Sequence, residues 1–291
     1  MVCFVILHFV AEKVTIECVE SIRKTCKGED YKIIIVENAS PNESYKQVQQ
    51  FVDASSDCEL IVSKENLGFA RGNNRGYKIA REKYNPDYIV VANNDTVIET
   101  ENFVKAITEI YNETKFDVLG PDIYLQSGAK QNPMMLDLPP KEWIEKEYIG
   151  AKKNARWPLF RYAKSYIETK IRLKKNTSLD VGESSFRREK RLNEPYLYGA
   201  FYIVSKRFIE NEENIFCPKT FMYHEEMIFS ILNRKKGYKT IYDSSIKVLH
   251  KHSVSTKKIS ANKIKKFKKR NEYFRDSAKV CLEIMEENGI E

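Results

Sequence analysis

The first 120 residues alternate between short apolar segments and amphipathic segments, and this alternation constrains the fold more than any other feature. The apolar segments predict strands near 2–9, 31–37, 59–63, 88–92 and 117–120. The amphipathic segments between them predict helices near 14–26, 42–54, 71–83 and 101–113. Strands that alternate with helices form a largely parallel sheet with helices on its faces. We therefore predict an α/β, doubly wound fold.

The regularity ends after residue 120. Residues 125–195 contain Pro139-Pro140 and a basic stretch, and they match no strand–helix unit, so we interpret them as an insertion. Further strands are predicted near 197–204, 240–243 and 246–250, and a helix near 225–236. A chain of 291 residues has the length of one large α/β domain with a small appendage. We place that domain at 1–256 and a basic helical extension at 257–291.

Cysteine usage and hydropathy predict a cytoplasmic location. No C-x-x-C pair occurs, and the apolar N-terminus carries no basic leader, so the thiols are expected to be reduced. No apolar run approaches the roughly 18 residues that span a bilayer. The six cysteines are Cys3, Cys18, Cys26, Cys58, Cys217 and Cys281.

The predicted strand at 88–92 runs directly into Asn93-Asn94-Asp95. In open α/β sheets, ligands bind outside the carboxyl ends of the strands. One carboxylate flanked by amides suits a single hard cation, Mg²⁺ or Mn²⁺, that bridges to substrate phosphates. Because Asn and Asp also favour turns, a strand-end turn without a ligand is the alternative.

A second polar segment, Asn66 to Tyr77, follows the strand at 59–63 and carries glycines at 68, 72 and 76. Glycines four residues apart lie on one helix face and allow close approach to the sheet or a ligand. The segment is not the dinucleotide fingerprint, and the chain contains no G-x-x-x-x-G-K-[ST] phosphate loop. The Arg and several Asn in the segment could still bind a nucleotide.

These residues carry a family resemblance. The pattern N-x-G-F-A-x-G-x-N-x-G at 66–76, followed by an apolar strand and N-N-D-T at 93–96, resembles the family 2 glycosyltransferases with the GT-A fold. Within them it is most similar to the bacterial rhamnosyltransferase-like branch, which builds surface polysaccharide. The resemblance implies a mixed, mostly parallel central sheet. It also implies that Asp95, the last position of the family's D-x-D motif, holds the metal on the donor diphosphate. Asn93 replaces the first acid of that motif.

The resemblance also implies where the nucleotide-sugar binds. Glu37 stands where the family has an Asp that contacts the donor's base or ribose, and His8 departs from the family's first-strand ending. We interpret His8 as structural and expect Glu37, Arg71 and Asn94 to line the nucleotide end of the cleft. The whole predicted donor set is Phe9, Glu37, Asn38, Asn66, Gly68, Arg71, Asn74, Asn93 and Asn94.

The catalytic prediction comes from the second half of the chain. Residues 197–204, 221–227 and 236–238 are similar to the family's G-A segment, acidic pair and closing G-Y. The second acid of the pair is the family's general base, which falls on Glu226. An attacking hydroxyl needs a carboxylate to accept its proton. Glu225 is the other candidate, and an acidic first turn favoured by the helix dipole is the structural alternative.

Ile246 to Thr256 resembles the family's closing V-x-H segment, in which a His completes the metal site. By position this is His250, with His252 as the second choice because alternate strand residues share a side. Either His could instead be an ordinary surface residue of a strand.

The net charge of +8 is concentrated in two segments, 152–175 and 257–275, each with nine Lys and Arg. Basic amphipathic helices with interleaved aromatic residues can lie on anionic membrane surfaces. A solvated basic face is the alternative. No recognised nucleic-acid module accompanies the charge, so we predict no nucleic-acid partner.

Together these features predict an inverting, Mn²⁺- or Mg²⁺-dependent glycosyltransferase. Its donor would be a UDP- or dTDP-sugar, and its acceptor a saccharide hydroxyl, expected to be lipid-linked, in bacterial surface polysaccharide synthesis. The cytoplasmic face of the membrane is the expected site of any peripheral attachment. The alternative is a catalytically weak binding module on the same fold. Three departures favour that alternative: Asn93, and Ile228 and Leu232, which stand where the family often has Asp and Arg.

Overall fold

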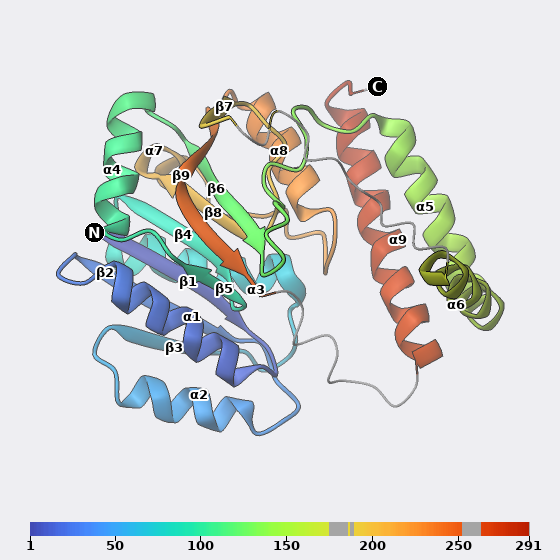
Figure 1. Ribbon diagram of the computed structural model, residues 1–291, viewed down its shortest axis with the longest axis horizontal. Coiled ribbons are helices and arrows are strands. Elements are labelled where there is room, and N and C mark those ends of the chain that lie inside the picture. The colour runs from blue at the N-terminus through green and yellow to red at the C-terminus, as the bar shows by residue number, and fades with distance from the viewer. Residues whose placement is uncertain (175–185, 187–188, 252–262, 291) are drawn as a thin grey trace.

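The computed structural model describes residues 1–174, 186, 189–251 and 263–290 (Figure 1). In this part of the chain one nine-stranded sheet has the order β3-β2-β1-β4-β8-β6-β9-β5, and β7 pairs with β9. The strands are β1 Val2–His8, β2 Tyr31–Glu37, β3 Cys58–Val62, β4 Tyr88–Asn93, β5 Thr96–Ile98, β6 Val118–Leu125, β7 Arg191–Asn193, β8 Phe201–Ser205 and β9 Thr240–His250. The helices are α1 Glu12–Thr25, α2 Ser44–Asp53, α3 Gly68–Ile79 with the π-helical turn η1 Ala80–Tyr84, α4 Phe103–Thr114, α5 Lys141–Arg156, α6 Pro158–Lys174, α7 Lys206–Asn211, α8 Glu225–Lys235 and α9 Lys263–Glu287.

The N-terminal part of the sheet is parallel, as the alternation predicts. β1 lies between β2 and β4, and β3 pairs with β2, all in parallel. These strands are apolar on both faces because helices cover both. One core lies between the sheet and α1, α2 and α4, and a second lies between the sheet and α3, α7 and α8. The doubly wound arrangement is therefore confirmed.

The rest of the sheet is mixed. β8 is antiparallel to both β4 and β6, whereas β6 and β9 are parallel. β5 and β7 pair antiparallel with β9 and were not predicted, because three residues give too little periodicity to recognise. The strands predicted at 240–243 and 246–250 are one strand, with an irregular register against β6. The strand predicted at 197–204 begins at Phe201.

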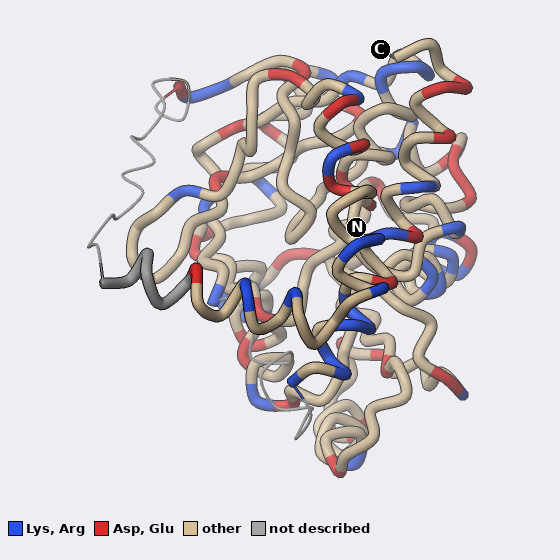
Figure 2. Tube along the Cα trace, turned by 90° about the vertical axis from the view of Figure 1, so that its right-hand side faces the viewer, with Lys and Arg blue, Asp and Glu red and all other residues tan. Residues whose placement is uncertain are grey.

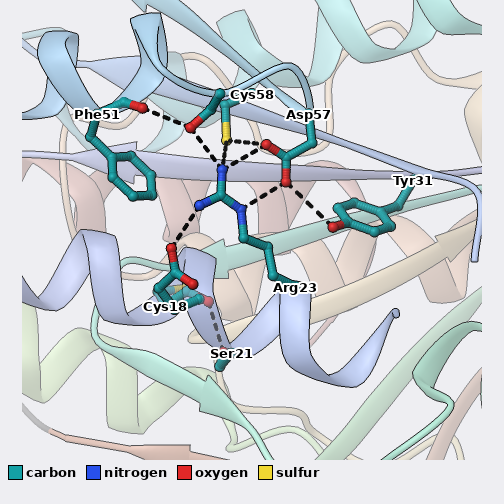
Figure 3. A network of polar contacts seen from close by, with 9 residues as sticks. Cys18, Ser21, Arg23, Tyr31, Phe51, Asp57 and Cys58 are labelled. Atoms are coloured by element: carbon teal, nitrogen blue, oxygen red, sulfur yellow. Dashed lines mark hydrogen bonds and ion pairs between the residues drawn. The ribbon is translucent and has the colours of Figure 1, made fainter. Parts of the chain in front are cut away.

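A partly exposed ion pair between Arg23 and Asp57 fixes α1 against the start of β3 (Figure 3). Arg23 Nε and Nη2 donate to the two Asp57 carboxylate oxygens at 2.8 and 2.7 Å, and Nη2 also donates to Ser55 Oγ at 2.8 Å. The guanidinium lowers the pKa of Asp57 to about 2. A bidentate pair of this kind fixes orientation as well as distance, so α1 is held in register with the sheet edge.

Helices α5, α6 and α9 form a helical appendage beside the sheet (Figure 1). The predicted insertion at 125–195 therefore contains two helices, α5 and α6, that periodicity did not identify. A third core joins Ile144 of α5, Ile228 and Ile231 of α8, and Cys281 and Met285 of α9. We predicted a separate helical extension at 257–291. In the described part of that segment, α9 packs on α8 of the main domain. In the described part of the chain, no helix combines the length and apolarity that a membrane span requires.

The glycines of α3 allow this helix to lie directly on the sheet. A Cβ at Gly72 would be 2.6 Å from Leu7 Cδ1, and one at Gly76 would be 2.5 Å from Val5 Cγ1. Both distances are shorter than real Cβ contacts allow. The predicted close approach is confirmed at these two positions, and it brings the first turn of α3 to the carboxyl ends of β1 and β2.

Candidate functional site

Two polar side chains meet at the carboxyl ends of β1 and β2. Glu37 is buried, and its Oε1 accepts the Ser40 N–H at 2.5 Å. Its Oε2 lies 3.3 Å from His8 Nε2 and has no hydrogen-bond partner among the described residues. Burial raises the pKa of Glu37 and lowers the pKa of His8 to about 4, so His8 is neutral near pH 7. Glu37 Oε2 is thus enclosed beside His8, which is itself held inside by Thr15 and Ser44.

The backbone beyond these strands is strained. Val10 and Ala39 have φ values of 57° and 56°, in the left-handed region that a β-branched residue such as Val rarely adopts. Ser40 Oγ accepts the Val10 N–H at 3.0 Å, and Asn42 Nδ2 donates to the Val10 carbonyl at 3.2 Å. Phe9, from the predicted donor set, is the half-buried residue just before Val10. Such strain persists where surrounding bonds impose it, and it is frequent at ligand sites.

Asn38 connects the end of β2 to the start of α3. Its Nδ2 donates to Asn66 Oδ1 at 3.2 Å and to the Gly68 carbonyl at 3.1 Å, and its Oδ1 accepts the Leu67 N–H at 2.9 Å. Three residues of the predicted donor set thus form one network. Gly68 has φ +77°, and a Cβ there would lie 2.2 Å from the Phe221 carbonyl oxygen.

Arg71 and Asn74 lie on the next turns of α3 and differ in exposure. Arg71 is exposed, and its Nε donates to the Leu67 carbonyl at 3.3 Å. Asn74 is buried: its amide donates to the Phe216 carbonyl at 2.8 Å and accepts the Phe216 N–H at 2.9 Å. The structure therefore uses Asn74 to hold the segment that leads to the acidic pair.

The three residues of the Asn93-Asn94-Asp95 segment contact different parts of the protein. Asn94 is buried, and its Nδ2 donates to Thr15 Oγ1 at 2.9 Å, toward α1. Asn93 is half-buried, with its N–H bonded to the Ala200 carbonyl at 2.8 Å. Asp95 Oδ1 lies 3.2 Å from His250 Nε2, because Thr96 of β5 pairs with His250 of β9. The short strand β5 is therefore what brings Asp95 to His250.

His250 has an oxygen close to each ring nitrogen. Its Nδ1 lies 2.6 Å from Gln131 Oε1, and its Nε2 lies 3.2 Å from Asp95 Oδ1. In metal sites one imidazole nitrogen commonly binds the metal while the other pairs with an oxygen. One imidazole and one carboxylate fit a cation that takes its remaining ligands from phosphate and water. Within the described ranges no group of three or more His, Cys, Asp and Glu could hold a metal alone. His252 lies outside the described residues.

The acidic pair begins α8 after a strained turn. Tyr223 and His224 have φ values of 81° and 62°. Glu225 is buried and hydrogen-bonded to Thr220, and burial, followed by the charge of Glu226, raises its pKa to about 8. Glu226 is only half-buried and passes beside Gly199, where a Cβ would lie 3.5 Å from its Oε2. Burial raises the pKa of Glu226 as well. Glu225 therefore faces the interior, whereas Glu226 is the acid that solvent can reach.

The helical appendage contacts the loop that precedes this pair. His224 Nε2 lies 3.0 Å from Glu147 Oε2 on α5, and Phe274 of α9 packs on the His224 ring with centroids 4.7 Å apart. The rings of Phe221 and Tyr273 are stacked at 4.3 Å. The appendage thus fixes the backbone from which Glu226 projects.

Tyr198, just before β8, connects the two parts of the site. Its ring lies 5.8 Å from that of His250. Burial raises the pKa of Tyr198, the charges of Glu226 and Asp95 raise it further, and a hydrogen bond to Gln131 acts in the opposite direction. Glu226 lies beside Gly199, the residue that follows Tyr198. Tyr198 lies within the segment 197–204 that resembles the family, but no role was predicted for it, and no motif or periodicity distinguished Gln131.

Comparisons with known proteins identify the family of this chain. Residues 3–228 match Glycosyl transferase family 2, and because this is most of the chain, the protein belongs to that family. No curated protein matches the sequence.

Among solved structures, the chain is similar to S. aureus TarS 1–349 in complex with UDP, with TM-score 0.54 and 12% identity over 87% of this chain. It is also similar to TarS 1–349 in complex with UDP-GlcNAc, with TM-score 0.54 and 10% identity over 97% of this chain. The matches span 60% and 70% of those two chains, and 37% of the longer TarS structure. At this identity the likeness concerns the fold, and the predicted GT-A fold is confirmed.

Proposed function

We propose that this protein transfers a sugar from a nucleotide-activated donor to a hydroxyl of a saccharide acceptor. The observation that carries the proposal is that Glu226 lies beside Gly199 while the adjacent Tyr198 lies beside His250, which in turn is 3.2 Å from Asp95. A solvent-accessible carboxylate and a pair of cation ligands at one end of a sheet are the groups that glycosyl transfer requires. Family membership supports the same activity.

In the proposed reaction, Glu226 accepts the proton of the acceptor hydroxyl as its oxygen attacks the anomeric carbon. The bond between that carbon and the phosphate oxygen breaks, and the nucleoside diphosphate leaves with the electron pair. Attack from the face opposite the leaving group inverts the configuration. The raised pKa of Glu226 strengthens it as a base. Glu225 is less suited, because it is buried and bonded to Thr220.

Asp95 and His250 are the residues we propose for Mn²⁺ or Mg²⁺. The 3.2 Å separation between His250 Nε2 and Asp95 Oδ1 supports this assignment. A bound cation would neutralise the charge that develops on the departing diphosphate.

For the donor, the TarS complexes with UDP and UDP-GlcNAc motivate testing UDP-sugars first, with dTDP-sugars as the other class. Glu37 at the end of β2 and the exposed Arg71 in the first turn of α3 are the proposed contacts at the nucleotide end. A lipid-linked acceptor, a role in surface polysaccharide and membership of the rhamnosyltransferase-like branch remain parts of this proposal.

The test is the release of nucleotide from a panel of sugar nucleotides, with and without Mn²⁺ and with candidate saccharide acceptors. Glu226→Gln should retain donor binding and lose transfer by about 10²–10⁴-fold, because the amide cannot accept the proton. Transfer within a few-fold of wild type would move the base elsewhere, with Glu225 tested next.

The alternative is a binding module with little catalysis, which the amide at Asn93 favours. Nucleotide binding without turnover of any donor would support it. Ile228 and Leu232 also depart from the family pattern, but they carry less weight as arguments for this alternative, because they belong to the core shared by α8 and α9.

A further inference from the structure

Large exposed apolar side chains are concentrated on the helical appendage. Among the described residues nine such side chains stand out, and seven of them lie between residues 143 and 167. Phe160 is 82% exposed, and the chain's two tryptophans are both exposed here. Contiguous apolar patches are uncommon on monomeric proteins and mark interaction sites. The seven are Trp143, Ile149, Trp157, Leu159, Phe160, Tyr166 and Ile167.

The same region is strongly basic. Residues 148–167 contain five Lys and Arg and no acid, and residues 263–271 contain six and no acid. These two segments are in contact: the Tyr162 and Phe267 rings are 5.6 Å apart, and Asn154 Nδ2 donates to Asn271 Oδ1 at 3.0 Å. Figure 2 views the molecule from this side and shows Lys and Arg spread along the helices there. We name residues 143–167 and 263–271 together the docking surface.

The exposed apolar side chains and the positive charges are distributed over the helices differently from the sequence prediction. Tyr273 and Phe274 were expected to belong to a membrane-facing segment at 257–275, but they pack inward on Phe221 and His224. Residues 257–262 lie outside the described residues. In the described part, α9 therefore supplies positive charge, and α5 and α6 supply the exposed apolar side chains.

We propose that the docking surface binds a bilayer that carries anionic lipids. Apolar side chains of α6 would enter the headgroup region while Lys and Arg contact lipid phosphates. A protein partner fits less well, because Lys is depleted in protein interfaces. A nucleic acid would satisfy the charge but leave Leu159, Phe160 and Ile167 without a function. This inference is independent of the proposed catalysis.

The test uses the full chain and phosphatidylcholine vesicles with or without phosphatidylserine. Because both tryptophans lie on the docking surface, insertion should shift their fluorescence to the blue as the protein co-sediments. Binding should require phosphatidylserine and fall steeply with salt. The double variant Leu159→Ser, Phe160→Ser should lower partition about tenfold or more, because two large apolar side chains no longer enter the bilayer.

The matched control is Val62→Ser, which removes an exposed apolar side chain from β3, away from the docking surface, and should bind as wild type does. Thermal unfolding should show all variants folded, since exposed positions tolerate substitution. The proposal is overturned by equal binding to neutral and anionic vesicles, by no binding to either, or by unchanged binding of the double variant. It is also overturned if the blue shift occurs with rising protein concentration alone, which indicates self-association, or only with single-stranded RNA.

Discussion

Gly68→Ala should separate the cost of an unusual backbone conformation from the cost of a blocked contact. Gly68 has φ +77°, and its added Cβ would lie 2.2 Å from the Phe221 carbonyl oxygen. That oxygen also accepts the Phe69 N–H at 2.6 Å. The clash is with backbone, so a side-chain rotation cannot relieve it. The loop at 221–224 would have to move, and the start of α8 with Glu226 would move with it.

The magnitude follows from these contacts. An Ala in the left-handed region costs about 1 kcal/mol. Loss of the Phe69–Phe221 hydrogen bond and overpacking add about 2 kcal/mol. Gly28→Ala is the matched control, because Gly28 has φ +81° and no heavy atom within 4 Å of the added Cβ. We therefore expect the free energy of unfolding to fall by about 1 kcal/mol in the control and about 3 kcal/mol in Gly68→Ala.

Urea unfolding and nucleotide release from a sugar nucleotide are the two measurements. If the loop at 221–224 moves to relieve the clash, Gly68→Ala should lose less stability than expected but should lose turnover. Gly28→Ala should lose about 1 kcal/mol of stability and keep its turnover. The reasoning is refuted if the two variants are equal in stability and both turn over as wild type does.

Three further predictions concern single side chains. Asp95→Ala should abolish the dependence of nucleotide binding on Mn²⁺, and calorimetry showing unchanged dependence would remove Asp95 from the metal site. Arg71→Lys should raise the donor dissociation constant without changing stability, because Lys cannot offer planar paired donors; an equal constant would exclude Arg71. The raised pKa of Glu225 means that the folded state holds its proton up to about pH 8, whereas the unfolded state releases it near pH 4.5. Wild-type stability should therefore fall as pH rises between these values. Glu225→Gln should make that slope shallower without abolishing it, because Glu37 and Glu226 also have raised pKa values, as urea titrations at several pH values would show.

The regular half of the fold was predictable because its signals are local. Buried parallel strands produce apolar runs, and the glycines of α3 follow helical spacing, so both can be recognised without knowledge of the partner strand. The positions of Glu37, Asp95 and Glu226 at strand and helix ends were also predictable, since motifs at the ends of elements stay beside those elements in the fold.

The remaining features depend on contacts between distant segments. β5 has three residues and exists because β9 provides its partner. Asn74 and Asn94 were predicted to bind the nucleotide-sugar donor, yet their amides hydrogen-bond to Phe216 and Thr15 in the interior. Whether an amide faces the cleft or the core depends on which backbone or hydroxyl groups lie opposite. Gln131 and Glu147 lie in the insertion, where no periodicity or motif distinguished them.

The packing of α9 behind the acidic pair has a consequence for biosynthesis. The parallel strands β1 to β4 and helices α1 to α4 are complete by about residue 114, so this half can begin to fold while the rest is still being translated. The turn at 221–224 must wait, because its supports, Tyr273, Phe274 and Ser277, are made some fifty residues later. Nascent chains that stall before α9 would thus expose Met227, Ile228 and Ile231 to solvent and to chaperones. Turnover would begin only once α9 has left the ribosome.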